Sequence, residues 1–230
     1  TRLLRTASGE QVWSERFDGD LHDIFAFQDE ITRKVAVAIQ VELTFGDAAH
    51  LWHGQTKNVT AWQAAVRARA AFNRYTAADN AIAERLLHEA IALDPGYTAA
   101  IVDLGICYYW RARYIPSADY EETLAAARRQ SAIVDRLDPD LPAAYTLRAL
   151  LAMLDGQYDS AIAHAAKASR LWPTDARAHT ILGLVQVYGG DIREGRIALQ
   201  EAMRLSPFPE SAIYYLVAIG EFWQGRLDIA

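Results

Sequence analysis

The stretch "EAIALDPGYTAA" (residues 89–100) contains a Leu-X-Pro phrase that closes a run of apolar residues at helical spacing. The same phrase returns three times, in "SAIVDRLDPDLPAA" (131–144), "KASRLWPTDARA" (167–178) and "EAMRLSPFPESA" (201–212). Proline lacks a backbone N–H and disfavours helical backbone in the residue before it, so each phrase predicts the end of a helix. One chain therefore ends a helix in the same way four times.

The prolines of these phrases define a period. Pro139, Pro173 and Pro207 follow one another at intervals of 34 residues, whereas Pro95 precedes Pro139 by 44. A fixed period of this length indicates stacked helical repeats. The unit that ends at Pro139 is longer than the others, and its extra residues, near 111–122, form either a longer helix pair or a loop.

Mainly small residues, with leucine at two positions, precede three of the four prolines at spacings of four and three, which places them on one helical face where a second helix can approach closely. These positions are Ala83, Leu87 and Ala90, then Ala161, Ala165 and Ala168, then Gly195, Leu199 and Ala202. Between the halves of two units lie "DGQYDSA" (155–161) and "GGDIREG" (189–195), where glycine suits a helix C-cap and the next Asp or Ser can start a helix. Each unit is predicted as a helix, a tight turn and an antiparallel helix.

On the basis of these phrases, residues 60–230 resemble a tetratricopeptide repeat (TPR) array with about four units and a truncated fifth. The resemblance implies a mainly α protein, a right-handed TPR-type α-α superhelix. Two positions depart from the repeat pattern. Arg148 stands where a large apolar residue is usual, and Gly195 replaces the usual alanine.

The segment 1–45 does not show the repeat pattern, and residues 46–59 are predicted to form a linker. "TRLLRTASGEQVWSERFDGDL" (1–21) places a turn-rich "ASGE" between two extended runs and predicts a short β-hairpin. The following stretch, 21–43, has apolar residues at every third or fourth position and predicts an amphipathic helix.

Residues 6–39 resemble the end of a TolB-like α/β region that passes directly into TPRs in bacterial proteins. The residues that carry this match are Gly9, Trp13, Glu15, Arg16, Asp18, Asp23, Ile24, Phe25, Gln28, Asp29, Glu30 and Ile31. The pairing is familiar from the C-terminal half of bacterial class III adenylate/guanylate cyclases, and it also occurs behind winged-helix DNA-binding regulators and some protein kinases. It implies the regulatory part of a cytoplasmic signalling protein, most often a cyclase, with the sensor of a transcriptional regulator or kinase as the alternative.

Composition and motifs favour no enzyme within this fragment. The net charge of −6 and the lack of an apolar run of membrane-spanning length argue against nucleic-acid and membrane partners. The carboxylates of "DGDLHD" (18–23) are interpreted as the end of a strand and a helix cap rather than a calcium loop. The two histidines of "HLWH" (50–53) lack the further ligands that zinc needs. Cys107 is interpreted as a small buried apolar residue. Arg67, Arg69 and Arg74 are interpreted as a solvated basic face. We expect no catalytic residue, cofactor or metal.

The remaining candidate is a surface. In TPR arrays the first helices of successive units line a concave groove, and the corresponding face here is aromatic and aliphatic with little charge. Such a face suits an amphipathic helix or an extended apolar segment of a protein or peptide, or a second copy of the chain. The alternative is that these residues contact neighbouring helices or the segment 111–122. The expected partner-binding residues are Val102, Ile106, Tyr109, Trp110, Leu150, Met153, Arg177, Leu184, Tyr188 and Tyr214.

Overall fold

The computed structural model describes residues 2–4, 11–14, 56–116, 119–206 and 211–223. The chain divides into two compact units, residues 1–49 and 50–230. In the first unit, strands β1 (Arg2–Leu4) and β2 (Gln11–Ser14) pair in antiparallel register, with Leu3 opposite Trp13. The helix predicted over 21–43 and most of the TolB-like match lie outside the described residues.

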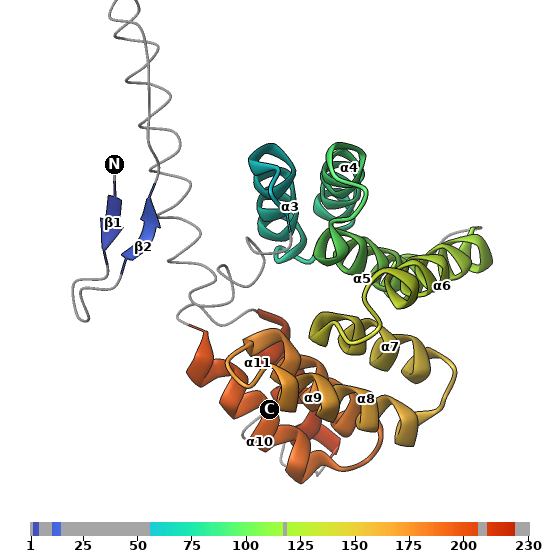
Figure 1. Ribbon diagram of the computed structural model, residues 1–230. Coiled ribbons are helices and arrows are strands. Elements are labelled where there is room, and N and C mark those ends of the chain that lie inside the picture. Colours follow the sequence, from blue (N-terminus) through green and yellow to red (C-terminus); the bar gives the residue numbers. More distant parts are fainter. Residues whose placement is uncertain (1, 5–10, 15–55, 117–118, 207–210, 224–230) are drawn as a thin grey trace, which may run out of the picture. The chain divides into compact units, whose positions relative to one another are not determined.

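The second unit is helical in its described part, which contains nine α-helices (Figure 1). In chain order they are α3 (Val59–Phe72), α4 (Ala77–Leu93), α5 (Thr98–Tyr114), α6 (Tyr120–Leu137), α7 (Pro142–Leu154), α8 (Tyr158–Leu171), α9 (Ala176–Tyr188), α10 (Ile192–Leu205) and α11 (Ser211–Trp223).

Neighbouring helices pack as consecutive pairs. Helix α3 packs on α4, α5 on α6, α7 on α8 and α9 on α10, while α11 packs on both α9 and α10. The first helices also contact one another from pair to pair, α3 with α5, α5 with α7 and α7 with α9. Repeated helical hairpins stacked on one another form a TPR-like superhelical fold, and the mainly α class predicted from the sequence is confirmed.

The Leu-X-Pro phrases mark helix ends as predicted. Helices α4, α6, α8 and α10 end at Leu93, Leu137, Leu171 and Leu205, the leucine of each phrase. Within the pairs, Gly156 and Gly190 adopt φ of 71° and 92° in the turns, a left-handed backbone that glycine adopts without a Cβ penalty. Each turn thus reverses the chain within a few residues, and the two helices of a pair run antiparallel.

The long unit consists of longer helices rather than an inserted loop. Helices α5 and α6 have 17 and 18 residues, whereas the helices of the next two pairs have 13 or 14. The sequence left these two possibilities open. The extra turn of α5 carries Arg113 and Tyr114 beyond the length of the other first helices.

The predicted packing positions form the helix interfaces. Ala83, Ala161 and Ala165 are fully buried, as are Leu199 and Ala202. A Cβ placed on Gly183 would lie only 2.5 Å from Cγ of Leu199, so α9 and α10 approach too closely for any other residue to fit there without a shift.

Arg148, which departs from the repeat pattern, is accommodated by polar contacts. Its guanidinium pairs with Asp135 of α6 and donates to the carbonyl of Pro139 at 3.0 Å. The same group lies 4.4 Å from the centroid of the Tyr145 ring, a cation–π contact. The guanidinium therefore bridges α7 to the end of α6, and an apolar side chain is not required at this position.

Candidate partner-binding pocket

The first helices and α11 surround a cavity of about 520 Å³. Aromatic and aliphatic side chains make up most of its lining, and Arg177 is the only charged residue among them in the part of the chain that the structure describes. The lining residues are Phe72, Tyr75, Ile106, Tyr109, Trp110, Tyr114, Leu150, Arg177, Thr180, Ile181, Leu184, Ala212, Tyr215 and Leu216. They come from α3 and the turn after it, α5, α7, α9 and α11, so four pairs and the last helix contribute to one site.

Six of the ten residues expected from the sequence lie together around this cavity: Ile106, Tyr109, Trp110, Leu150, Arg177 and Leu184. Three of the six, Ile106, Leu150 and Leu184, hold equivalent positions in the first helices of three successive pairs.

The other four expected residues have different surroundings. Val102 and Met153 are buried in the helical core, with exposed fractions of 1% and 4%. Tyr188 packs edge-to-face against Trp223, with their ring centroids 5.4 Å apart. Tyr214 is 57% exposed on α11, and its neighbour Tyr215 lines the cavity instead.

Two lining residues at the N-terminal side were not among the ten expected from the sequence, although each lies one repeat period before a residue that was. Phe72 precedes Ile106 by 34 residues, and Tyr75 precedes Tyr109 by the same interval. The period therefore pointed to both residues, even though the first helix of this unit matches the repeat pattern only in outline. Tyr114 carried no such signal, since it belongs to the extra turn of α5.

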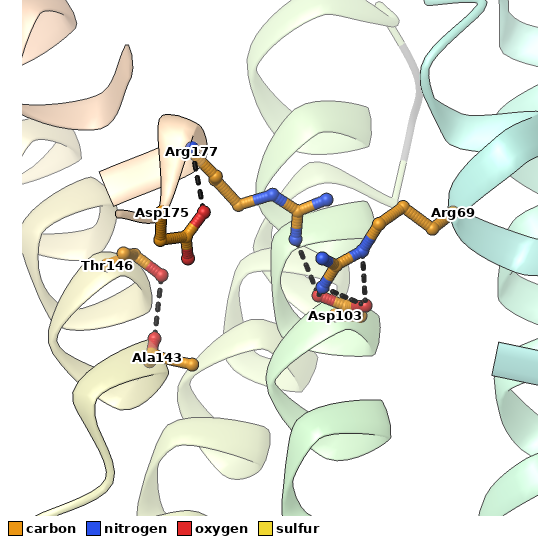
Figure 2. Close-up of polar contacts among 6 residues, drawn as sticks. All are labelled: Arg69, Asp103, Ala143, Thr146, Asp175 and Arg177. Atoms are coloured by element: carbon orange, nitrogen blue, oxygen red, sulfur yellow. Dashed lines mark hydrogen bonds and ion pairs between the residues drawn. The ribbon is translucent and has the colours of Figure 1, made fainter. Parts of the chain in front are cut away.

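A buried ionic cluster lies beside the cavity (Figure 2). Asp103 of α5 accepts hydrogen bonds from Arg69 at 2.8 and 2.9 Å and from Arg177 at 2.6 Å, and the two guanidinium groups reach it from α3 and α9. The Arg69 side chain is only 7% exposed. The interpretation of Arg67, Arg69 and Arg74 as a solvated basic face is therefore wrong for Arg69, because Asp103 provides a buried counter-charge one repeat later in the sequence.

A second carboxylate completes this cluster. Asp175 caps the start of α9, where its side chain accepts a hydrogen bond from the backbone N–H of Arg177 at 2.9 Å. Asp175 is itself 6% exposed. Two arginines and two aspartates thus meet in the interior, and the cap fixes the position from which Arg177 reaches across to α5.

The environment shifts the protonation equilibria of these groups. Burial lowers the pKa of Arg69 to about 10, and the charge of Arg177 acts in the same direction. Burial alone would raise the pKa of Asp103, but the two guanidinium groups outweigh it and hold that pKa below its ordinary value. Burial raises the pKa of Asp175 despite the nearby Arg177. Asp103 is therefore the anion on which both arginines depend.

An aromatic row extends along the same face. Successive rings in the first part of the row have centroids 5.5, 6.4 and 5.7 Å apart, and Arg113 then bridges the Tyr114 and Tyr188 rings. The guanidinium of Arg113 lies 5.5 Å from the Tyr114 ring centroid and 4.9 Å from that of Tyr188. The aromatic row consists of Tyr75, Phe72, Trp110, Tyr114, Tyr188 and Trp223.

Among the described residues, no three His, Cys, Asp or Glu side chains gather closely enough to hold a metal ion. The thiol of Cys107 is buried, and burial raises its pKa well above the ordinary value, which disfavours the reactive thiolate. No helix in the described ranges is long and apolar enough to cross a membrane.

Comparison with known proteins supports the fold. No family model matches the chain. A crystal structure of a thermophilic TPR protein from Thermus thermophilus superposes with a TM-score of 0.55 and 16% identity, covering 84% of this chain and 97% of that protein. That likeness shows a TPR-like fold.

In sequence, the chain is 35% identical over 105 residues to a Rhizobium meliloti (strain 1021) protein named "Putative adenylate cyclase 3". The match covers 46% of this chain and 18% of the length of the Rhizobium protein. The relationship therefore extends over a minor part of that longer protein.

Proposed function

We propose that the helical array is a non-catalytic protein–protein interaction module that holds a protein or peptide segment in the cavity. The observation that carries this proposal is a cavity of about 520 Å³ with mainly apolar lining, formed where the first helices converge. Small-molecule sites have volumes of about 300–1,000 Å³ and similar linings, with a few polar groups that orient the ligand, and apolar grooves receive the anchoring side chains of peptide segments in the same way. Here Arg177 and Thr180 supply such groups.

The proposed setting is the cytoplasmic, regulatory C-terminal part of a bacterial class III adenylate/guanylate cyclase. The similarity to the Rhizobium protein supports this setting over a winged-helix regulator or a kinase. Because class III cyclases build their active site between two catalytic domains, a partner or second copy bound by the helical array has a direct way to change their pairing. This step rests on analogy with the family.

Binding at the cavity is tested with aromatic truncations. Trp110→Ala and Tyr215→Ala remove lining side chains from α5 and α11, whereas Tyr120→Ala makes the same kind of change on α6, outside the lining. Short random peptides are selected against the chain, and affinities are then measured by fluorescence anisotropy. We expect both lining variants to weaken binding and the control to leave it unchanged. Equal affinities for all three variants would count against the cavity as the binding site.

The catalytic and genomic parts of the proposal have separate tests. A nucleotide-turnover assay on the chain is expected to show no activity, and measurable product would contradict a non-catalytic role. The coding sequence upstream of Thr1 is expected to encode a class III catalytic domain. A DNA-binding or kinase domain there, or no further domain, would contradict the cyclase setting.

A further inference from the structure

We propose that Arg113 selects an acidic partner: it binds a carboxylate of the peptide segment whose apolar side chains enter the cavity. This inference rests on the proposed function and specifies the chemistry of the partner. Arg113 differs from the arginines of the buried cluster. Arg69 and Arg177 both bind Asp103, whereas no carboxylate in the described ranges lies within ion-pair distance of Arg113.

The position of Arg113 places its charge at the edge of the cavity. Arg113 precedes Tyr114, a lining residue, and its guanidinium lies over the Tyr114 and Tyr188 rings. Its Nε is buried and has no hydrogen-bond acceptor among the described residues, while the side chain as a whole is only partly buried. An arginine already held between two rings loses little conformational freedom when it binds a carboxylate, and its planar donors suit that group.

The charges around the cavity favour an anionic partner. The described lining contains no Asp or Glu, and Arg177 is already ion-paired with Asp103 at 2.6 Å. The partner's negative charge therefore meets Arg113 at the edge rather than Arg177 inside. Charge complementarity of this kind contributes specificity beyond the contribution of apolar contact.

The apolar surface favours a peptide segment over a compact small molecule. Tyr215 lines the cavity yet is 55% exposed, and Trp223, which is 48% exposed, extends the aromatic row onto α11. The apolar surface thus continues beyond the cavity. A molecule that fills only the 520 Å³ of the cavity leaves this outer apolar surface exposed to water. An extended or helical segment covers both parts, with bulky apolar residues in the cavity and an acidic residue beside Arg113.

The test is a double-mutant cycle between chain and peptide. The tightest peptide from the random selection is synthesised with its acidic residues intact and, separately, with each Asp or Glu changed to the amide. Affinities for the wild-type chain and Arg113→Gln are measured by fluorescence anisotropy. We expect Arg113→Gln to weaken the acidic peptide about tenfold and to leave the amide peptide almost unaffected. Arg67→Gln, which removes an exposed positive charge from α3, is the matched control and should affect both peptides equally.

The other outcomes are distinguishable. Tyr215→Ala should weaken both peptides, because it removes apolar contact and leaves Arg113 in place. If peptides bind but Arg113→Gln affects the acidic and amide forms alike, or if the selected peptides are basic, the inference is wrong and the proposed function stands. If no peptide binds the wild-type chain, both are wrong. If lauric acid binds at the cavity and peptides do not, the partner is a small molecule and the inference is wrong.

Discussion

At the scale of single residues, Asp103 has the greatest influence on the interior of the helical unit. Two guanidinium groups, from Arg69 and Arg177, share its carboxylate at a site where all three side chains are largely removed from water. Ions in such a place carry a large desolvation penalty, which is offset only while every charge keeps its partner. The cluster is thus sensitive to the loss of one member and tolerant of complete replacement.

Asp103→Asn is expected to lower the free energy of unfolding by about 3–5 kcal/mol, because it removes the carboxylate that two buried cations share. Denaturant unfolding followed by circular dichroism measures the change. The control is Asp135→Asn, which breaks the more exposed pair with Arg148 and should cost less than about 1 kcal/mol. The triple variant Arg69→Met, Asp103→Leu, Arg177→Met should be more stable than Asp103→Asn. Equal stability of Asp103→Asn and Asp135→Asn would refute this account.

The same residue predicts a pH dependence. Burial raises the pKa of Asp103, but Arg69 and Arg177 outweigh burial and hold it below 3.8. A lowered folded-state pKa contributes stability that is present above 3.8 and is lost as the pH falls through the folded value. Asp175 has the opposite sign, because burial raises its pKa.

We therefore expect the unfolding free energy to fall less steeply with decreasing pH below 3.8 in Asp103→Asn than in the wild-type chain. The difference between the two slopes can reach about 1.4 kcal/mol per pH unit for one proton. Denaturant titrations at a series of acidic pH values measure both slopes, and parallel slopes would show that Asp103 does not contribute.

At the scale of elements, the sequence predicted helix ends far better than helix lengths. The Leu-X-Pro phrases placed the ends of α4, α6, α8 and α10 correctly because proline acts locally on the backbone. The lengths of α5 and α6 depend on how far each helix finds apolar surface to cover, which is a tertiary property. For this reason the longer pair and the cavity residue Tyr114 could not be predicted from local pattern.

Helix pairing depends on the close approach at Gly183. Alanine there gains about 1 kcal/mol in helix propensity, but its Cβ would overlap Cγ of Leu199 at 2.5 Å. Overpacking costs about 1–3 kcal/mol, so Gly183→Ala should destabilise the chain by a net amount of up to about 2 kcal/mol in thermal or denaturant unfolding. In a Leu199→Ala background the overlap is relieved, and the loss caused by Gly183→Ala should shrink. An equal loss in both backgrounds would place the strain elsewhere.

At the scale of the whole helical unit, the ionic cluster joins pairs that are not neighbours. In a simple helical stack each repeat contacts only the repeats next to it. Here Arg177 of the fourth pair binds Asp103 of the second, 74 residues away, and Arg69 of the first pair binds the same carboxylate. Arg69 and Asp103 lie 34 residues apart, one repeat period, but the interpretation of Arg69 as solvated did not predict their pair. The contact with Arg177 depends on how strongly the stack of first helices curves, and this curvature cannot be inferred from local sequence.

This link predicts that instability spreads between distant pairs. Leu199→Ala removes a fully buried side chain from α10 and should cost about 2–5 kcal/mol. Through Arg177 and Asp103, part of this loss should appear as faster amide hydrogen exchange in α3 and α4, which mass spectrometry resolves helix by helix. Adding Asp103→Asn removes the link, so the further acceleration caused by Leu199→Ala in α3 and α4 should become smaller. An Asp135→Asn background keeps the link and should transmit the effect as the wild-type chain does. If both backgrounds transmit it equally, the stack couples through neighbouring pairs alone, and the cluster acts only on its immediate surroundings.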